Sequence, residues 1–92
     1  GRFTHTDVKV FPNPVRPEYD GLVSVSGLVT NAWIKITDIS GNLVFQTRAD
    51  GGQVSWNGRD IHGRKVNSGV YLVMATSDFG EETVAAKILF LK

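Results

Sequence analysis

The sequence predicts an all-β domain, an antiparallel immunoglobulin-like β-sandwich of about seven strands. Three observations carry this prediction. Short runs of β-branched and aromatic residues recur along the chain, and turn-forming residues separate them at the roughly 8–12-residue spacing typical of sandwiches. No window repeats apolar residues at helical spacing over the ~10 residues that a convincing helix needs. The 92 residues suffice for one domain with a single modest core.

The first two predicted strands flank a proline-rich stretch. Residues 8–11 alternate briefly and then meet Pro12, Asn13 and Pro14. Because proline has no amide donor, a strand here must end or lie at a sheet edge. After a loop, residues 22–26 alternate between valine and serine, which predicts a half-buried strand.

The third predicted strand carries an out-of-phase tryptophan. In residues 33–37, Ile34 and Ile36 are expected to face the core. Alternate residues of a strand point to opposite faces, so Trp33 is expected to be exposed. Trp33 is therefore a candidate contact residue.

A turn and two further strands complete the middle of the chain. Asp38 and Gly41 lie in the turn before a strand at 43–47, and an aspartate in this position usually bonds the amides of its own turn. A short strand at 53–56 ends at Trp56. We expect Trp56 to close the end of the core, in preference to forming a sugar-stacking platform with the other tryptophan.

The closing hairpin, 70–76 and 83–92, is apolar on both faces, so each face needs a cover or a partner. Leu89 and Leu91 are expected to point outward. Either the loop at 12–20 covers this second face, or a partner binds there, and the edge of the closing strand is able to accept a partner strand. One face of the hairpin is expected to carry Tyr71, Val73 and Ala75 together with Val84, Ala86, Ile88 and Phe90. Of these, Tyr71, Val73, Ile88 and Phe90 are expected to lie in the core.

Composition excludes several classes of function. The net charge is +1 with scattered basic residues, so no nucleic-acid surface is predicted. No apolar run approaches the ~20 residues that span a bilayer, so no membrane insertion is expected. The chain has no cysteine, which removes disulfides and thiolate chemistry. Residues 1–7 lack periodicity and are predicted to be a linker preceding a sandwich at 8–92, and the first three residues resemble a cut end, so we expect a longer parent protein.

Catalytic, metal and cofactor sites are not predicted. His62 has Asp60 as an acidic neighbour, whereas a metal site needs three or four converging ligands. No serine lies in a nucleophile elbow, and the glycines are too widely spaced to cradle a phosphate. The prediction is a protein that is not an enzyme and binds no cofactor.

Four motifs, in order along the chain, carry a resemblance to a known family. They are Val10-Phe11-Pro12-Asn13-Pro14, the stretch from Ile34 to Val44 with Asp38 and Gly41, the stretch from Asn67 to Val73 with Gly69 and Tyr71, and the closing Lys87 to Lys92. Over residues 8–92 the chain resembles the C-terminal sorting domain of the type IX (Por) secretion system of Bacteroidota. The stretch 56–71 is also similar to the Ig-like domain of the flagellar hook-capping protein.

The resemblance implies a signal domain that ends a secreted protein. It implies transit through the periplasm, recognition by the outer-membrane translocon and its shuttle barrel, and delivery to the outer-membrane surface or the medium. It also implies a sortase that removes the domain and links the parent to lipopolysaccharide, although some members keep the domain. The candidate recognition residues are Lys87, Leu89, Leu91, Lys92 and Trp33.

Two alternatives remain open at this point. One is a structural Ig-like module, either hook-cap-like or at the end of a surface β-propeller protein. The other is a carbohydrate-binding or adhesive module that uses Trp33.

Overall fold

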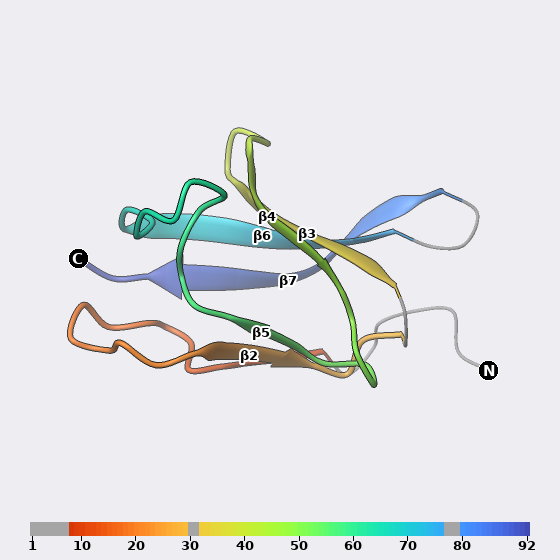
Figure 1. Cartoon of the computed structure of the whole chain (residues 1–92), viewed down its shortest axis with the longest axis horizontal. Coiled ribbons are helices and arrows are strands. Elements are labelled where there is room, and N and C mark those ends of the chain that lie inside the picture. Colours follow the sequence, from red (N-terminus) through yellow and green to blue (C-terminus); the bar gives the residue numbers. More distant parts are fainter. Residues whose placement is uncertain (1–7, 30–31, 77–79) are drawn as a thin grey trace.

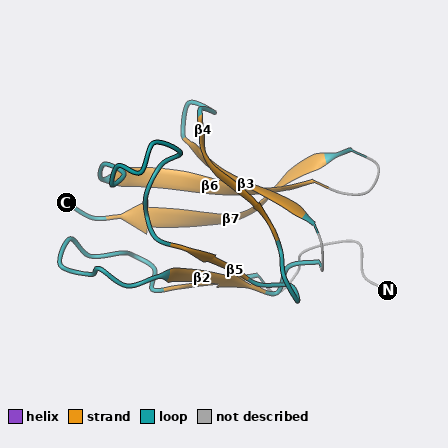
Figure 2. Ribbon diagram, in the orientation of Figure 1, coloured by secondary structure: helices purple, strands orange, loops and turns teal. Residues whose placement is uncertain are grey.

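Seven strands form two antiparallel sheets. The computed structural model describes residues 8–29, 32–76 and 80–92, so the predicted linker at 1–7 lies outside the described residues. Every predicted strand is present to within about two residues, and Figure 2 shows only strands and loops in the described part of the chain. The strands are β1 (Lys9–Phe11), β2 (Val23–Ser26), β3 (Trp33–Asp38), β4 (Leu43–Arg48), β5 (Val54–Trp56), β6 (Gly69–Thr76) and β7 (Glu82–Phe90).

The two sheets stack as a sandwich, which confirms the predicted fold class. One sheet has the order β1-β2-β5 and the other β4-β3-β6-β7, and Figure 1 shows β2 and β5 as one layer beneath the other four strands. β1 ends at Phe11, directly before the prolines, and lies at the edge of its sheet. This position suits residues that cannot donate to a neighbouring strand.

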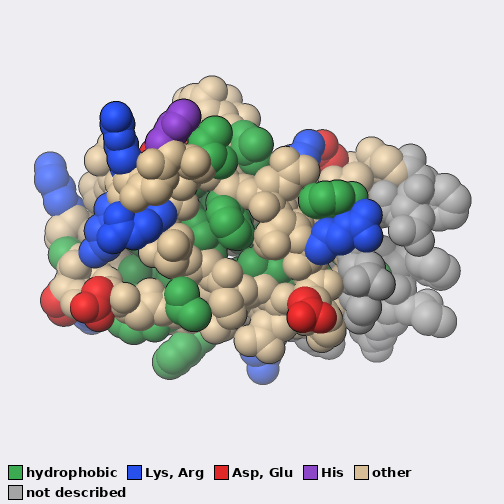
Figure 3. All heavy atoms as spheres, viewed as in Figure 1, with side chains coloured by type: hydrophobic (Ala, Val, Ile, Leu, Met, Phe, Trp, Pro, Cys, Tyr) green, Lys and Arg blue, Asp and Glu red, His purple; other side chains and the backbone are tan. Residues whose placement is uncertain are grey.

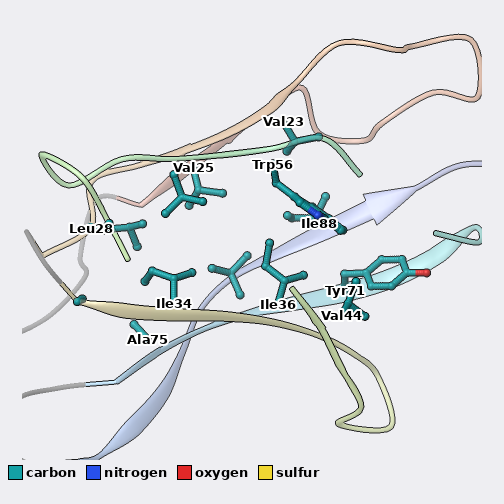
Figure 4. Close-up of a cluster of buried hydrophobic side chains, with 14 of the residues drawn as sticks. Val23, Val25, Leu28, Ile34, Ile36, Val44, Trp56, Tyr71, Ala75 and Ile88 are labelled. Carbon is teal, nitrogen blue, oxygen red and sulfur yellow. The ribbon is translucent and has the colours of Figure 1, made fainter. Parts of the chain in front are cut away.

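The core lies between the sheets and is built from the alternating inward positions of both. Figure 4 shows Val23 and Trp56 on one side facing Ile36 and Ile88 on the other. Burying each such side chain contributes about 1.5–3 kcal/mol. Phe90, expected inside, is only partly buried and packs against this core. The buried set is Val15, Val23, Val25, Leu28, Ala32, Ile34, Ile36, Val44, Ala49, Val54, Trp56, Tyr71, Val73, Ala75 and Ile88.

The expectation that Val84 shares a face with Ile88 and Phe90 is wrong, and a β-bulge is the reason. Val73 pairs with Ala86, whereas the next residue, Met74, pairs with Val84, so Ala85 is an extra residue in β7. An extra residue reverses the alternation beyond it. Val84 therefore lies on the outer face and is 51% exposed.

Candidate recognition surface

The closing strand presents alternate side chains to the outer face of the four-stranded sheet. Ile88 is fully buried, while its neighbour Leu89 is 40% exposed. Lys87 is exposed on the same outer face. Beyond the strand, Leu91 is half-buried and Lys92 is exposed. The candidate recognition residues of this segment are therefore accessible, at least in part.

The backbone edge of this strand is already occupied. The side-chain nitrogen of Asn13 donates a hydrogen bond of 3.0 Å to the carbonyl of Lys87, and its side-chain oxygen accepts one of 3.1 Å from the N–H of Leu89. Val15 then donates its N–H to the carbonyl of Leu89 at 2.7 Å, and its carbonyl accepts from the N–H of Leu91 at 2.8 Å. We call the residues Asn13 to Val15 the strap.

The strap bears on two expectations: that the edge of the closing strand can accept a partner strand, and that the loop at 12–20 covers the second apolar face. A partner strand cannot pair with the edge between Lys87 and Leu91 while the strap is in place. The loop at 12–20 was also expected as a possible cover for the second apolar face. It covers the edge and leaves Leu89 and Val84 exposed on that face.

The outer face of the four-stranded sheet is an apolar surface with charged margins. Leu72 and Met74 of β6 are half-buried there, beside their β7 partners Lys87 and Val84. An ion pair of 3.0 Å joins Lys35 of β3 to Glu82 of β7 across the sheet. This pair is solvent-exposed, so its contribution to stability is small.

Trp33 lies at the far end of this outer face from Leu89. Trp33 pairs with Thr76, whereas Leu89 pairs with Val70, and these two β6 positions are about 20 Å apart along the strand. The ring is 42% exposed, and the guanidinium carbon of Arg48 lies 4.5 Å from its centre. One face of the ring is thus covered by a cation. The structure does not bring Trp33 together with the closing strand.

Asp38 and Gly41 form a self-contained turn. One carboxylate oxygen of Asp38 accepts hydrogen bonds of 2.9 Å from the N–H groups of Ser40 and Asn42, and the other accepts one of 3.0 Å from the Asn42 side chain. These hydrogen bonds lower the pKa of the Asp38 carboxyl, and the bond from the Asn42 side chain has the largest effect. Gly41 has a φ of 91°, which favours glycine in this turn. Asp38 has the role in its own turn that the sequence predicts.

The loop at 57–68 repeats this turn, a feature that the sequence analysis missed. Asp60 accepts hydrogen bonds of 2.9 Å from the N–H groups of His62 and Arg64, and Gly63 has a φ of 82°. The pKa of the Asp60 carboxyl is lowered mainly by the hydrogen bond from the backbone N–H of Arg64. The sequence contains the pattern Asp-Ile-x-Gly twice, at 38–41 and at 60–63, and this repeat could have predicted the second turn.

Gly69 and Tyr71 begin β6 at the end of the sandwich. Gly69 pairs with Phe90 at a φ of 144°, and the hydroxyl of Tyr71 donates a hydrogen bond of 2.7 Å to the carbonyl of Asn67. Burial raises the pKa of the Tyr71 hydroxyl, and the negative charge of Asp38 adds to this shift. The hydroxyl of Tyr71 therefore connects the end of the loop at 57–68 to β6.

Trp56 closes this end of the core, as expected. It is fully buried, and its indole N–H donates a hydrogen bond of 2.9 Å to the carbonyl of Arg59. Its ring packs edge-on against Phe90 at 5.5 Å and Tyr71 at 6.1 Å, and stacks on Phe45 at 6.3 Å. Aromatic pairs of this geometry add about 0.5–1.5 kcal/mol each.

A cleft of about 560 Å³ opens beside this aromatic cluster, and the sequence analysis did not predict it. Three segments form its walls: 15–23, the loop at 57–68, and the closing residues 90–92. All three lie at the left-hand end of the molecule in Figure 1, where the C-terminus is drawn. Separate loops that converge at one end of a sandwich are a common location for binding.

Within residues 8–29, 32–76 and 80–92, no three His, Cys, Asp or Glu side chains lie close enough together to hold a metal ion. The same residues include no helix of the length and apolar character required to cross a bilayer. His62 lies exposed in the loop at 57–68.

Comparison with known families identifies the family of the domain. Residues 9–90 match the family described as the secretion system C-terminal sorting domain. The chain belongs to this family. The sorting domain is therefore non-catalytic, and its family implies recognition by the type IX machinery and secretion to the cell surface.

Solved structures agree with the family assignment. The sorting domain is 38% identical to PorZ, a surface component of the type IX secretion system of Porphyromonas gingivalis, with a TM-score of 0.80. It is also similar in fold to PorU from the same organism, at 24% identity and a TM-score of 0.59. The alignments cover 94% and 91% of this chain, but only 12% and 9% of PorZ and PorU. No curated protein matches the sequence.

Proposed function

We propose that this domain, comprising residues 8–92, directs the protein that carries it across the outer membrane to the cell surface. In this proposal the domain is recognised by the type IX translocon, its shuttle barrel and a sortase, with lipopolysaccharide linkage of the parent. The observation that supports it most strongly is the family match over residues 9–90. The likeness to PorZ, a component of the same secretion system, is in keeping with it.

The segment from Lys87 to Lys92 is our candidate for the part that the machinery reads. Because the strap occupies the backbone edge of this segment, recognition of the folded domain relies on side chains. Leu89 offers an exposed apolar side chain on the outer face, and Lys87 offers a charge beside it. Contiguous apolar surface with a polar rim marks interaction sites, and Leu89 adds to the apolar surface of Leu72, Met74 and Val84 on this face.

The test fuses residues 1–92 to a periplasm-targeted fluorescent reporter in a host with a type IX system. Leu89→Ser removes the exposed apolar group without touching the strap bonds, which use only backbone atoms of Leu89. Val84→Ser is the matched control, because Val84 is exposed on the same strand and face but lies outside the candidate segment. Surface fluorescence should be retained by the parent and Val84→Ser, and reduced by Leu89→Ser.

A second arm deletes Leu91 and Lys92. This deletion removes the bond from the Leu91 N–H to Val15, so its melting temperature must be measured beside its delivery. Equal loss of delivery in both point variants would show that the closing segment has no special role. A parent fusion that remains in the periplasm would contradict the sorting function itself.

A second candidate function is a retained structural module, and the likeness to PorZ favours it. The 38% identity is to a protein described as a surface component of the secretion system. An antibody against residues 8–92, used on the native parent protein at the cell surface, separates the two cases. Detection of the domain on the mature protein supports retention, while its absence from a surface-delivered parent supports removal.

A further inference from the structure

We propose that the cleft at the end of the sandwich binds an extended acidic peptide segment, in which carboxylate and apolar side chains alternate. This inference rests on the proposed function and deepens it. It names the chemistry of a partner segment that meets the closing residues Leu91 and Lys92, both of which line the cleft.

The floor of the cleft is apolar and preformed. Val15 and Val23 form its base at 4% and 1% exposed, so the apolar surface open to an occupant is mainly that of the half-buried Phe90 and Leu91. Val15 is fixed by backbone hydrogen bonds to Leu89 and Leu91. Phe90, the third apolar group, packs against Trp56 in the aromatic cluster. The volume of about 560 Å³ lies within the range of roughly 300–1,000 Å³ of ligand sites. An occupant would therefore meet a floor that needs little rearrangement, which favours affinity.

The rim of the cleft is mainly basic. Arg16, Lys65 and Lys92 line it, each from a different wall, whereas Asp20 is the one acidic lining residue among those that the structure describes. All three basic residues are exposed and form no ion pair with another described residue. Figure 3 shows basic side chains gathered over the left-hand end of the molecule, with acidic ones beneath. Such a rim complements a partner with spaced negative charges.

The arrangement favours a peptide over other anions. A single phosphate is usually held by converging backbone amides at a helix N-terminus, and this sandwich offers cations on three separate walls. Single-stranded nucleic acids stack bases on open aromatic faces. Phe90 instead packs edge-to-face with Trp56 and Tyr71, at 5.5 and 5.4 Å between ring centres. The other aromatic lining residue, Tyr19, lies against the backbone of Gly21, and its hydroxyl donates a hydrogen bond of 2.7 Å to the carbonyl of Leu22. An extended peptide can place alternate side chains on the floor and toward the rim.

The test titrates the whole chain with a blocked peptide of alternating aspartate and leucine, followed by amide chemical shifts. Shifts should concentrate at Gly58, Val66 and 90–92, and binding should weaken with added salt. The single variants Arg16→Glu and Lys65→Glu should each weaken binding roughly fivefold or more. Lys9→Glu is the matched control, because Lys9 is an exposed lysine of β1 outside the cleft, and it should change binding less than about twofold.

Several results would overturn the inference. These are no shifts at millimolar peptide, equal binding of a lysine–leucine peptide, tighter binding of a single-stranded oligonucleotide, or an equal loss in Lys9→Glu. Reporter delivery by the parent fusion without peptide binding would refute this inference and leave the proposed function intact. Peptide binding without delivery would refute the proposed function and keep the cleft as a peptide site.

Discussion

The side chain of Asn13 and the backbone of Leu89, 76 positions apart in sequence, are joined by a hydrogen bond of 3.1 Å. With its second bond to the carbonyl of Lys87, the amide of Asn13 occupies the edge of β7 as a peptide group of a neighbouring strand would. Edge strands of sandwiches are usually protected from pairing with other chains. In this domain one side chain and the following residues provide that protection.

Asn13→Ala tests the strap. Two exposed hydrogen bonds are lost, so the free energy of unfolding should fall by about 1–2 kcal/mol. Urea unfolding measures this change, and hydrogen exchange of the Leu89 amide should become faster. Ser55→Ala, an exposed polar position in β5, serves as the control and should change stability by less than about 0.5 kcal/mol. Unchanged stability and exchange in Asn13→Ala would show that the strap is held by other contacts.

Phe90→Ala tests the aromatic cluster. The ring contacts Trp56 and Tyr71 but is only partly buried, so we expect a loss of about 2–4 kcal/mol, below that of a fully buried phenylalanine. Chemical denaturation provides the measurement. Leu89→Ala, the exposed neighbour, should cost less than about 1 kcal/mol. Similar losses in both variants would mean that the two faces of β7 are not distinguished by burial.

Asp38 should make stability depend on acid pH. Its pKa in the folded protein lies below the ordinary value of 3.8, because its carboxylate accepts hydrogen bonds from Asn42 and Ser40. A lowered folded pKa stabilises the protein above the unfolded pKa, and this contribution is lost as pH falls from about 4 through the folded pKa. In Asp38→Asn, the fall in urea midpoint between pH 6 and pH 2.5 should be smaller than in the parent. An identical fall would show that Asp38 does not contribute.

Gly52 and Gly63 form a matched pair for backbone geometry. Both have positive φ, 81° and 82°, so alanine at either position costs about 1–2 kcal/mol. A Cβ at Gly52 would also lie 2.6 Å from the carbonyl oxygen of Leu28, whereas one at Gly63 would meet nothing within 4 Å. Gly52→Ala should therefore lose about 2–5 kcal/mol in chemical denaturation. Equal losses in the two variants would show that the loop around Leu28 moves without cost.

Strand positions and most inward faces could be predicted because alternation is a local property of the chain. Ile34 and Ile36 face the core as their spacing predicts. The orientation of Val84 could not be predicted, since the bulge at Ala85 is visible only in the pairing of β7 with β6. A single extra residue reverses the face of every residue beyond it.

The surface could be predicted only in part, for the same reason. Exposure of Leu89 and Trp33 follows from alternation, but the distance between them depends on strand register. The cleft depends on three segments that are far apart in sequence, and no local pattern brings Arg16, Lys65 and Lys92 together. The strap requires one amide to meet an edge 76 positions away, which motif spacing alone does not reveal.

The parallel pairing of Val15 with Phe90, at the end of β7, also affects when the domain is able to fold. The strap and the four-stranded sheet both need β7, so neither can form until that strand has been synthesised. Sandwiches dominated by such non-local contacts fold in about milliseconds to seconds, whereas synthesis proceeds at roughly 5–20 residues per second. A partner that binds only the folded domain therefore binds only chains in which β7 has been made, and a chain truncated before β7 is not bound because its four-stranded sheet is incomplete.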